Sequence, residues 1–430
     1  MDIEVICTGD EVLTGKIVNS NFSYITQKLE DFGLAVRRGV TVGDNREDLL
    51  NAFRESGERA DVVIVNGGLG PTVDDLSQEV AAQAAGVELE LNEEWMNRMR
   101  EYFGARGRTM PENNNKQAML PKGAELVDNP IGTACGFGVN IGRAVFYFTP
   151  GVPRELRRMM EEELVPRLLK KSGTQAVIIL KRFHSYGLGE SHVDSLLGGL
   201  EEMVPDGSLK LGFRAHYPQL ETKLTIQARD MNEARAKLEP VEAELRSRIG
   251  NFILAEDDDT LEGVVRKLLL ERESTLAVVE DFTGGQITAR LSPLPDAGQF
   301  LARGIVVPSA QSKMESFAED GEMGAANWEP GISVAESLAQ RCRDRTGASH
   351  GLSVLCQVVP DESRLAGNMS GSIYIAIATE SEVVHRRARL AGNRDWVRLG
   401  AVEMGMDSLR RYLLGLPVHE KTDFERTPTR

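Results

Sequence analysis

The sequence predicts an α/β protein with about three domains. The chain has 430 residues, and one domain typically takes roughly 150. Hydrophobic residues make up 41% and charged residues 27% of the chain, which are ordinary values for a folded globular protein. Short apolar runs also alternate with amphipathic segments. This alternation is typical of a mostly parallel sheet covered by helices on both faces.

The first 171 residues show the alternation most clearly, and we expect them to form the first domain. Its strands are predicted where short, nearly continuous apolar runs end in polar loops, and its helices where apolar residues recur at helical spacing. The predicted strands are 3–7, 34–42, 61–66 and 143–148, and the predicted helices are 21–32, 45–56 and 152–170.

The remaining chain divides into two further predicted domains and a tail. A small α+β middle domain is predicted at 172–256, because the pattern there is strand, helix, two strands, helix and a short strand. Mixed strands and helices follow at 257–416, which predicts a third, α/β domain. The last segment, 417–430, is polar, and we expect it to be frayed.

Charge and hydropathy exclude several classes of protein. Fifty Lys and Arg residues against 65 Asp and Glu give a net charge of −15, which disfavours nucleic acid and anionic membranes as partners. The longest apolar runs are far shorter than the roughly 18 residues needed to cross a bilayer. The N-terminus lacks the basic and apolar regions of a signal peptide, so we expect a cytoplasmic protein.

A glycine-rich stretch is the first candidate for chemistry. It reads GGLGPTVDD at 67–75, between a predicted strand and a predicted helix. Glycines let backbone N–H groups approach an anion, and the helix N-terminus adds positive dipole character, so a phosphate-bearing ligand is indicated. Asp74 or Asp75 would repel that phosphate unless a divalent cation lay between them. The alternative is that the glycines only turn the chain and Asp74 only caps the helix.

Other polar loops are expected at the same edge of the sheet, because the carboxyl ends of parallel strands meet there. One loop follows the first strand, one holds Asp44, and two more are glycine turns. Candidate ligand-binding residues on these loops are Thr8, Gly9, Asp10, Asn19, Asp44, Gly132, Thr133, Gly151, Pro153 and Glu155. Arg106, Arg108 and Lys116 form a cationic cluster that could offset ligand phosphates or could simply be solvated surface.

These motifs resemble the competence/damage-inducible CinA family. The resemblance covers essentially the whole chain and rests on GDEVLTGKIVNSN, GGLGPTVDD, GTACGF and TPGVPRE. It implies a three-layer α/β/α molybdopterin-binding-like fold for 1–171 and a CinA deamidase-like fold for 257–416. It also implies a homodimer that hydrolyses the pyrophosphate bond of ADP-ribose or related dinucleotides such as FAD, with Mg, Co, Ni or Mn as the divalent ion.

The resemblance also suggests roles for single residues of the first domain. Gly67, Gly68, Gly70 and Thr72 match the phosphate loop. Asp44 and Asp75 match acidic positions around the ligand and metal. We expect Asp75, with Asp44 or Asp10, to hold the cation, and Glu155 to act as a general base.

The third domain departs from the family pattern at the chemistry. Where the family's deamidase reads E-S-C-T-G-G, this chain has Glu280, Asp281, Phe282, Thr283, Gly284 and Gly285. Asp281 therefore stands at the position of the serine nucleophile, and a carboxylate is a poor attacker of an unactivated amide. Lys313 remains at the family's lysine position. We expect this domain to keep its fold without the family's nicotinamide mononucleotide deamidase activity.

Two alternatives stay open. The first domain could bind a nucleotide or pterin without hydrolysing it. The third domain could still be an active amidohydrolase through an unexpected nucleophile.

Overall fold

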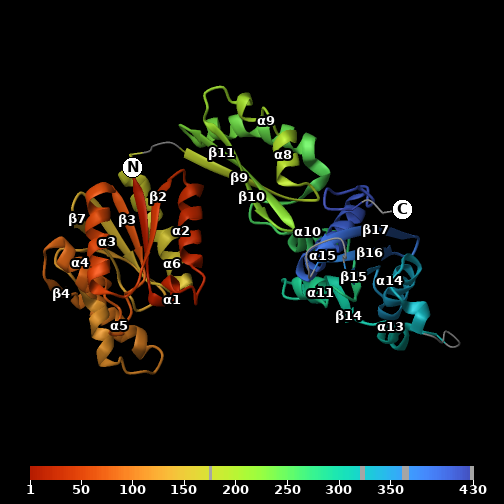
Figure 1. The fold of residues 1–430 in the computed structure, drawn as a ribbon, viewed down its shortest axis with the longest axis horizontal. Helices are drawn as coiled ribbons and strands as arrows, with labels where there is room; N and C mark the ends of the chain where they lie inside the picture. The colour runs from red at the N-terminus through yellow and green to blue at the C-terminus, as the bar shows by residue number, and fades with distance from the viewer. Residues whose placement is uncertain (174–176, 320–324, 361–367, 427–430) are drawn as a thin grey trace. The chain divides into compact units, whose positions relative to one another are not determined.

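The computed structural model describes residues 1–173, 177–319, 325–360 and 368–426. Its contacts divide the chain into two compact units (Figure 1). The first is Met1–Ile179 with Gln227–Met231, and the second is Leu180–Ile226 with Asn232–Arg430. Among the described residues no helix is long and apolar enough to cross a membrane.

A six-stranded sheet forms the centre of the first unit, in the order β2-β1-β3-β8-β7-β6. The four strands from β2 to β8 run parallel, and β7 and β6 continue the sheet antiparallel. The strands are β1 (Ile3–Thr8), β2 (Val36–Val42), β3 (Val62–Asn66), β8 (Ala144–Thr149), β7 (Gly136–Ile141) and β6 (Glu125–Val127). A separate pair joins β4 (Leu89–Leu91) to β5 (Met119–Pro121).

Helices cover both faces of this sheet, as alternation along β3 shows. Val63 and Val65 pack with one set of helices, whereas Val62 and Ile64 pack with the other. Successive strand residues point to opposite faces, so both faces are buried. The first set comprises α3 (Arg46–Arg59), α4 (Ser77–Ala85) and α5 (Glu93–Gly104), and the second comprises α2 (Ser20–Asp31), α6 (Pro153–Met159), the π-turn η2 (Met160–Leu164) and α7 (Val165–Ser172). Short helices are α1 (Asp10–Leu13) and η1 (Glu112–Ala118).

The second unit begins with the predicted small α+β pattern. Its sheet has the order β10-β11-β9-β12. The elements are β9 (Val177–Tyr186), α8 (Glu190–Leu196), η3 (Glu201–Met203), β10 (Leu209–His216), β11 (Gln219–Ala228), α9 (Met231–Ile249), η4 (Gly250–Phe252) and β12 (Ile253–Glu256). Each strand and helix predicted from the sequence at 176–254 is present in the predicted order.

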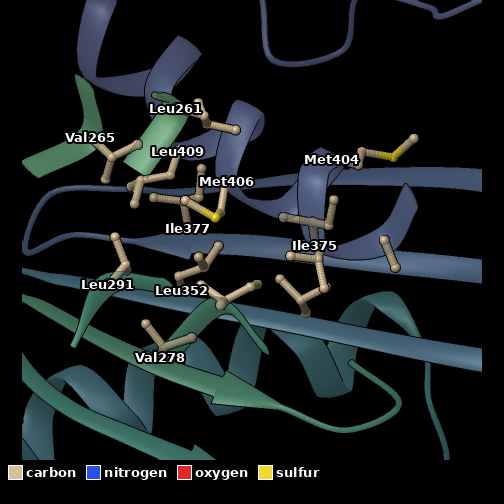
Figure 2. Packing of buried hydrophobic residues seen from close by; sticks show 14 of the residues in the cluster. Leu261, Val265, Val278, Leu291, Leu352, Ile375, Ile377, Met404, Met406 and Leu409 are labelled. Carbon is tan, nitrogen blue, oxygen red and sulfur yellow. The ribbon is translucent and has the colours of Figure 1, made fainter. Parts of the chain in front are cut away.

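A five-stranded sheet follows in the same unit, in the order β14-β13-β15-β16-β17. The strands are β13 (Leu276–Glu280), β14 (Leu301–Val306), β15 (His350–Pro360), β16 (Met369–Ala378) and β17 (Val383–Gly392), and the helices are α10 (Leu261–Glu271), α11 (Gln286–Leu291), α12 (Ala297–Phe300), α13 (Ala310–Phe317), η5 (Ala325–Trp328), α14 (Ile332–Thr346) and α15 (Arg394–Leu414). Figure 2 shows Leu261 of α10, Leu409 of α15 and Ile377 of β16 in one apolar core. The opposite face packs on α14. The predicted mixed α/β fold is therefore confirmed.

The tail corrects one expectation, because residues 417–426 are packed and not frayed. The buried Arg386 donates to two tail carbonyls at 3.0 and 2.8 Å. The guanidinium of Arg411, which is fully buried, pairs with the Glu420 carboxylate. Asp423 accepts a hydrogen bond of 2.8 Å from the loop before α8. Buried cations need counter-charges, and the tail supplies Glu425 to Arg386 and adds Glu420 to the Asp407 that already pairs with Arg411. A polar composition alone could not indicate this.

Candidate functional site

The carboxyl ends of the parallel strands surround a cavity of about 410 Å³. Loops after β2, β1, β3 and β8 all contribute to it, which agrees with the prediction that these polar loops meet at one edge of the sheet. Of the residues predicted from the sequence, those lining it are Thr8, Gly9, Asp44, Gly67, Gly68, Gly70, Asp74, Asp75, Thr133, Gly151 and Glu155.

Five predicted residues do not line the cavity, although each contributes to its loops. Asp10 pairs with Asp44, Asn19 caps α2, and Thr72 hydrogen-bonds to Asp75. Gly132 donates to the side chain of Asn129, and Pro153 is the first residue of α6.

The glycines of the loop after β3 are required by its geometry. Gly67 has a φ of +116°, and a Cβ there would lie 2.5 Å from the Thr8 hydroxyl oxygen. Gly68 has a φ of +68°, and its Cβ would lie 2.4 Å from the Ser77 hydroxyl. Both positive φ and close approach exclude larger residues.

This loop carries unused hydrogen-bond donors. Within the described part of the chain, the backbone amides of Gly68, Leu69 and Gly70 donate to no protein acceptor. The adjacent Thr8 hydroxyl is buried and likewise has no hydrogen-bond partner. Buried polar groups are normally paired. Three successive amides without a protein acceptor, on residues that line the cavity beside an unpaired buried hydroxyl, are suited to bind an anion.

Carboxylates also line the cavity. The amide of Asp10 donates to the Asp44 side chain, and the amide of Asp44 donates to the Asp10 side chain, each at 3.1 Å. Burial raises the pKa of Asp44; the Asp10 amide opposes this shift, and neighbouring carboxylates add to it. This concentration of negative charge would be relieved by a bound cation.

The carboxylates do not form a complete metal site by themselves. Among the described residues, no three His, Cys, Asp or Glu side chains are grouped closely enough to hold a metal ion. One oxygen of Asp75 is already held by the amide of Thr72 at 2.8 Å. Magnesium-type cations, however, are often bound by one or two carboxylates together with substrate phosphates. The donor set fits a cation that arrives with a phosphorylated ligand.

Glu155 lies at the β8 end of the cavity. The side-chain amide of Asn129 donates to Glu155 Oε2 at 2.7 Å and to the carbonyl of Ala134 at 2.9 Å. These contacts fix the orientation of the carboxylate and leave Oε1 without a protein donor in the described part of the chain.

Sequence reasoning missed Gln117, which lines the cavity together with Glu11 of the predicted loop after β1. Gln117 lies in η1, and its side chain donates to the carbonyl of Leu69 at 3.0 Å. An isolated glutamine in a polar segment carries no signal of such a role. Lys116, predicted to be near ligand phosphates or solvated, instead contacts the carbonyl of Thr72 and the carboxylate of Glu79.

In the second unit, the residues at the deamidase-like positions are buried and bind one another. Asp281 and Lys313 are an ion pair, with Oδ2 3.1 Å from Nζ and side chains only 4% and 2% exposed. The other oxygen of Asp281 accepts from the amide of Cys356 at 2.9 Å and from the amide of Phe282. Burial raises the pKa of Asp281, and the Lys313 ammonium partly offsets this shift.

Glu280 and Thr283 have a structural role here. The buried Glu280 carboxylate accepts from the Thr283 hydroxyl at 2.7 Å and from the amides of Ile287 and Thr288 at 3.1 and 2.9 Å. It therefore fixes the turn into α11, in which Gly284 has a φ of +67°.

Together, the two units define an α/β protein whose first sheet carries a polar cavity at the carboxyl ends of its parallel strands. Three family descriptions match the chain: "Probable molybdopterin binding domain" at residues 4–170, "Damage-inducible protein CinA KH domain" at 181–255 and "CinA C-terminal domain" at 258–413. The domain limits at 171 and 256 stay predictions.

The chain belongs to the CinA family, which confirms the resemblance seen in its motifs. It is 37% identical over 415 residues to a CinA-like protein of Shewanella sp. (strain MR-4), covering 96% of each chain. It is equally similar, with the same coverage, to a protein of Shewanella oneidensis named nicotinamide-nucleotide amidohydrolase PncC. A solved CinA structure from Thermoplasma acidophilum is 32% identical, with a TM-score of 0.35, and covers 40% of this chain and 96% of its own.

Proposed function

We propose that the first unit hydrolyses the pyrophosphate bond of ADP-ribose or a related dinucleotide such as FAD and releases AMP. The observation that carries this proposal is the cradle of free amides at Gly68, Leu69 and Gly70 beside the unpaired Thr8 hydroxyl. Such donors suit the non-bridging oxygens of a diphosphate. The membership of the CinA family supports a hydrolase in general terms.

The proposed mechanism depends on positioning and charge neutralisation. The amides and the Thr8 hydroxyl would bind phosphate oxygens, while Asp75, with Asp44 or Asp10, would hold a divalent ion (Mg, Co, Ni or Mn). When bound, that ion would polarise a phosphoryl oxygen and neutralise developing charge. Glu155, oriented by Asn129, takes the proton of the attacking water as the general base.

The second part of the proposal is that the CinA C-terminal domain of this chain lacks deamidase activity. The Asp281 side chain occupies the nucleophile position and neutralises Lys313, which is then unable to activate another group. One relative is named an amidohydrolase, so the activity itself needs a direct test. Ammonia release from nicotinamide mononucleotide that disappears in Asp281→Ala would overturn this part.

A panel of pyrophosphate-linked nucleotides crossed with the four cations tests the first part. We expect AMP release by the wild type, at least tenfold less by Asp75→Asn, and no change in Asp48→Asn, whose side chain is exposed on α3. Binding of ADP-ribose without AMP release under any cation would favour the alternative of a non-catalytic nucleotide or pterin-binding protein.

The other features of the proposal concern assembly and location. We propose a homodimer, tested by light scattering coupled to size-exclusion chromatography, and a cytoplasmic protein whose partner is a small nucleotide and not a nucleic acid. The net charge of −15 supports the last point.

A further inference from the structure

The two acidic loops of the cavity are connected by a single carboxylate outside it. Glu79, on α4, forms an ion pair with Arg46, which lies two residues after Asp44. The same carboxylate lies 3.6 Å from the Nζ of Lys116. The loop after β2 and the helix η1 are thereby tied to one side chain.

Lys116 extends this connection to the loop that carries Asp75. Its Nζ donates to the carbonyl of Thr72 at 3.1 Å. The same carbonyl accepts from the amide of Asp75, and the Asp75 carboxylate in turn accepts from the amide of Thr72 at 2.8 Å. The turn that presents Asp75 is therefore closed on itself and anchored from outside by the ammonium group of Lys116, whose side chain is 22% exposed.

The next residue of η1 anchors the other end of the same loop. Gln117 donates to the carbonyl of Leu69 at 3.0 Å, and the Asn114 side chain holds Gln117 at 2.8 Å. Because Gln117 and Lys116 of η1 bind the Leu69 and Thr72 carbonyls, the peptide groups of the loop between them have little freedom to rotate.

We propose that Arg46, Glu79 and Lys116 form a positioning relay that sets the separation of the Asp44 and Asp75 loops, with Lys116 as its principal member. This inference rests on the proposed function and deepens it, because it assigns control of cation and diphosphate affinity to a side chain that does not line the cavity. Lys116 is a positioning residue, since it acts on the ligand only through Thr72 and Asp75.

The expected effect of removing Lys116 follows from its contacts. Lys116→Met loses a charge-assisted hydrogen bond to the Thr72 carbonyl, while Glu79 keeps Arg46 as a partner. The loop is then held less firmly in the geometry that binds the cation and the diphosphate, and a tenfold loss of affinity corresponds to about 1.4 kcal/mol. We expect KM for ADP-ribose and the cation concentration for half-maximal activity each to rise about tenfold. The change in kcat should stay within about twofold, because the loop holds ground state and transition state alike.

Four variants make the test specific. Lys116→Arg keeps a cationic donor and should recover most of the affinity. Glu79→Gln should raise the cation concentration for half-maximal activity, as Lys116→Met does. Lys122→Met is the matched control, since Lys122 pairs with Glu90 at 2.7 Å on the same domain and does not line the cavity. Thermal unfolding of each variant verifies that it folds.

The outcomes separate this inference from the proposed function. If the wild type releases AMP and Lys116→Met behaves like Lys122→Met, or loses kcat at unchanged KM, the relay is wrong and the proposed function stands. If the wild type releases no AMP, hydrolysis is wrong, and calorimetric titration with Mn²⁺ and ADP-ribose decides the relay. Binding about tenfold weaker in Lys116→Met supports the relay, and equal binding overturns it.

Discussion

The buried ion pair between Asp281 and Lys313 allows a quantitative test of the proposal that this site in the second unit is closed to deamidase chemistry. The substitution Asp281→Asn removes the charge but keeps an oxygen that can accept from the amides of Phe282 and Cys356. The remaining change is an unpaired Lys313 ammonium whose side chain is 2% exposed. Breaking a buried pair in this way costs about 3–5 kcal/mol.

A melting experiment on the full chain measures this cost. For 150–250 residues, 1 kcal/mol corresponds to about 2–4 °C in Tm, so the transition of the second unit should fall by about 6–20 °C. Hydrogen exchange of peptides from β13 and β15 identifies which transition belongs to this unit. The control is Asp296→Asn, because Asp296 pairs with Arg266 at 2.8 Å but its side chain is 48% exposed.

A second variant distinguishes a buried pair from a local packing defect. Replacing both partners with apolar residues, Asp281→Leu with Lys313→Met, should recover most of the lost stability, because burial already raises the pKa of Asp281 despite the nearby cation. An Asp281→Asn protein within about 1 kcal/mol of the wild type would refute the closed site and reopen the question of deamidase activity.

Three further predictions concern the cavity and the tail. Because the pKa of Asp44 is raised, its carboxyl keeps a proton at a pH where an exposed carboxyl is ionised. The affinity for Mn²⁺, measured by titration, should therefore fall as the pH drops through that pKa. Asp44→Asn should lose this pH dependence. Gly67→Ala should lower stability by about 1–3 kcal/mol in urea unfolding and abolish nucleotide binding, and normal binding would contradict the cradle. Deletion of 417–430 should lower the Tm of the second unit by several degrees, because Arg386 and Arg411 lose buried partners; an unchanged Tm would show that the tail contributes no stability.

The sequence predicted the four parallel strands of the first sheet but not the antiparallel β6 and β7 or the β4-β5 pair. Burial on both faces leaves a nearly continuous apolar run, which makes a strand easy to predict. The strand at 61–66 is almost entirely apolar, and every residue of β3 is buried. Helix α15 shows the limit of this reasoning. Its charged residues suggest a solvated face, yet Glu403, Asp407 and Arg411 are at most 1% exposed. They pair with one another or with distant residues, and periodicity carries no information about such partners.

The parts of the candidate site that depend on consecutive residues were predictable from the sequence. The parts that depend on contacts between distant segments were not. The three glycines within 67–70 are enough to predict that the backbone can approach a ligand closely there. Lys116 was predicted as a cation for phosphates or as solvated surface, whereas it binds a carbonyl and Glu79. Its role depends on α4 and η1 lying together, which no spacing in the sequence expresses.

The hydrogen bonds of Glu280 have a consequence for how motifs in such chains are interpreted. Four donors from Thr283, Ile287 and Thr288 make this carboxylate indispensable to the bend that precedes α11. The Glu and Thr of E-x-x-T-G-G therefore have a structural role that does not depend on which residue stands at the nucleophile position between them. A match to these motif residues therefore indicates the local fold. Assigning a reaction requires inspection of the residue at the nucleophile position.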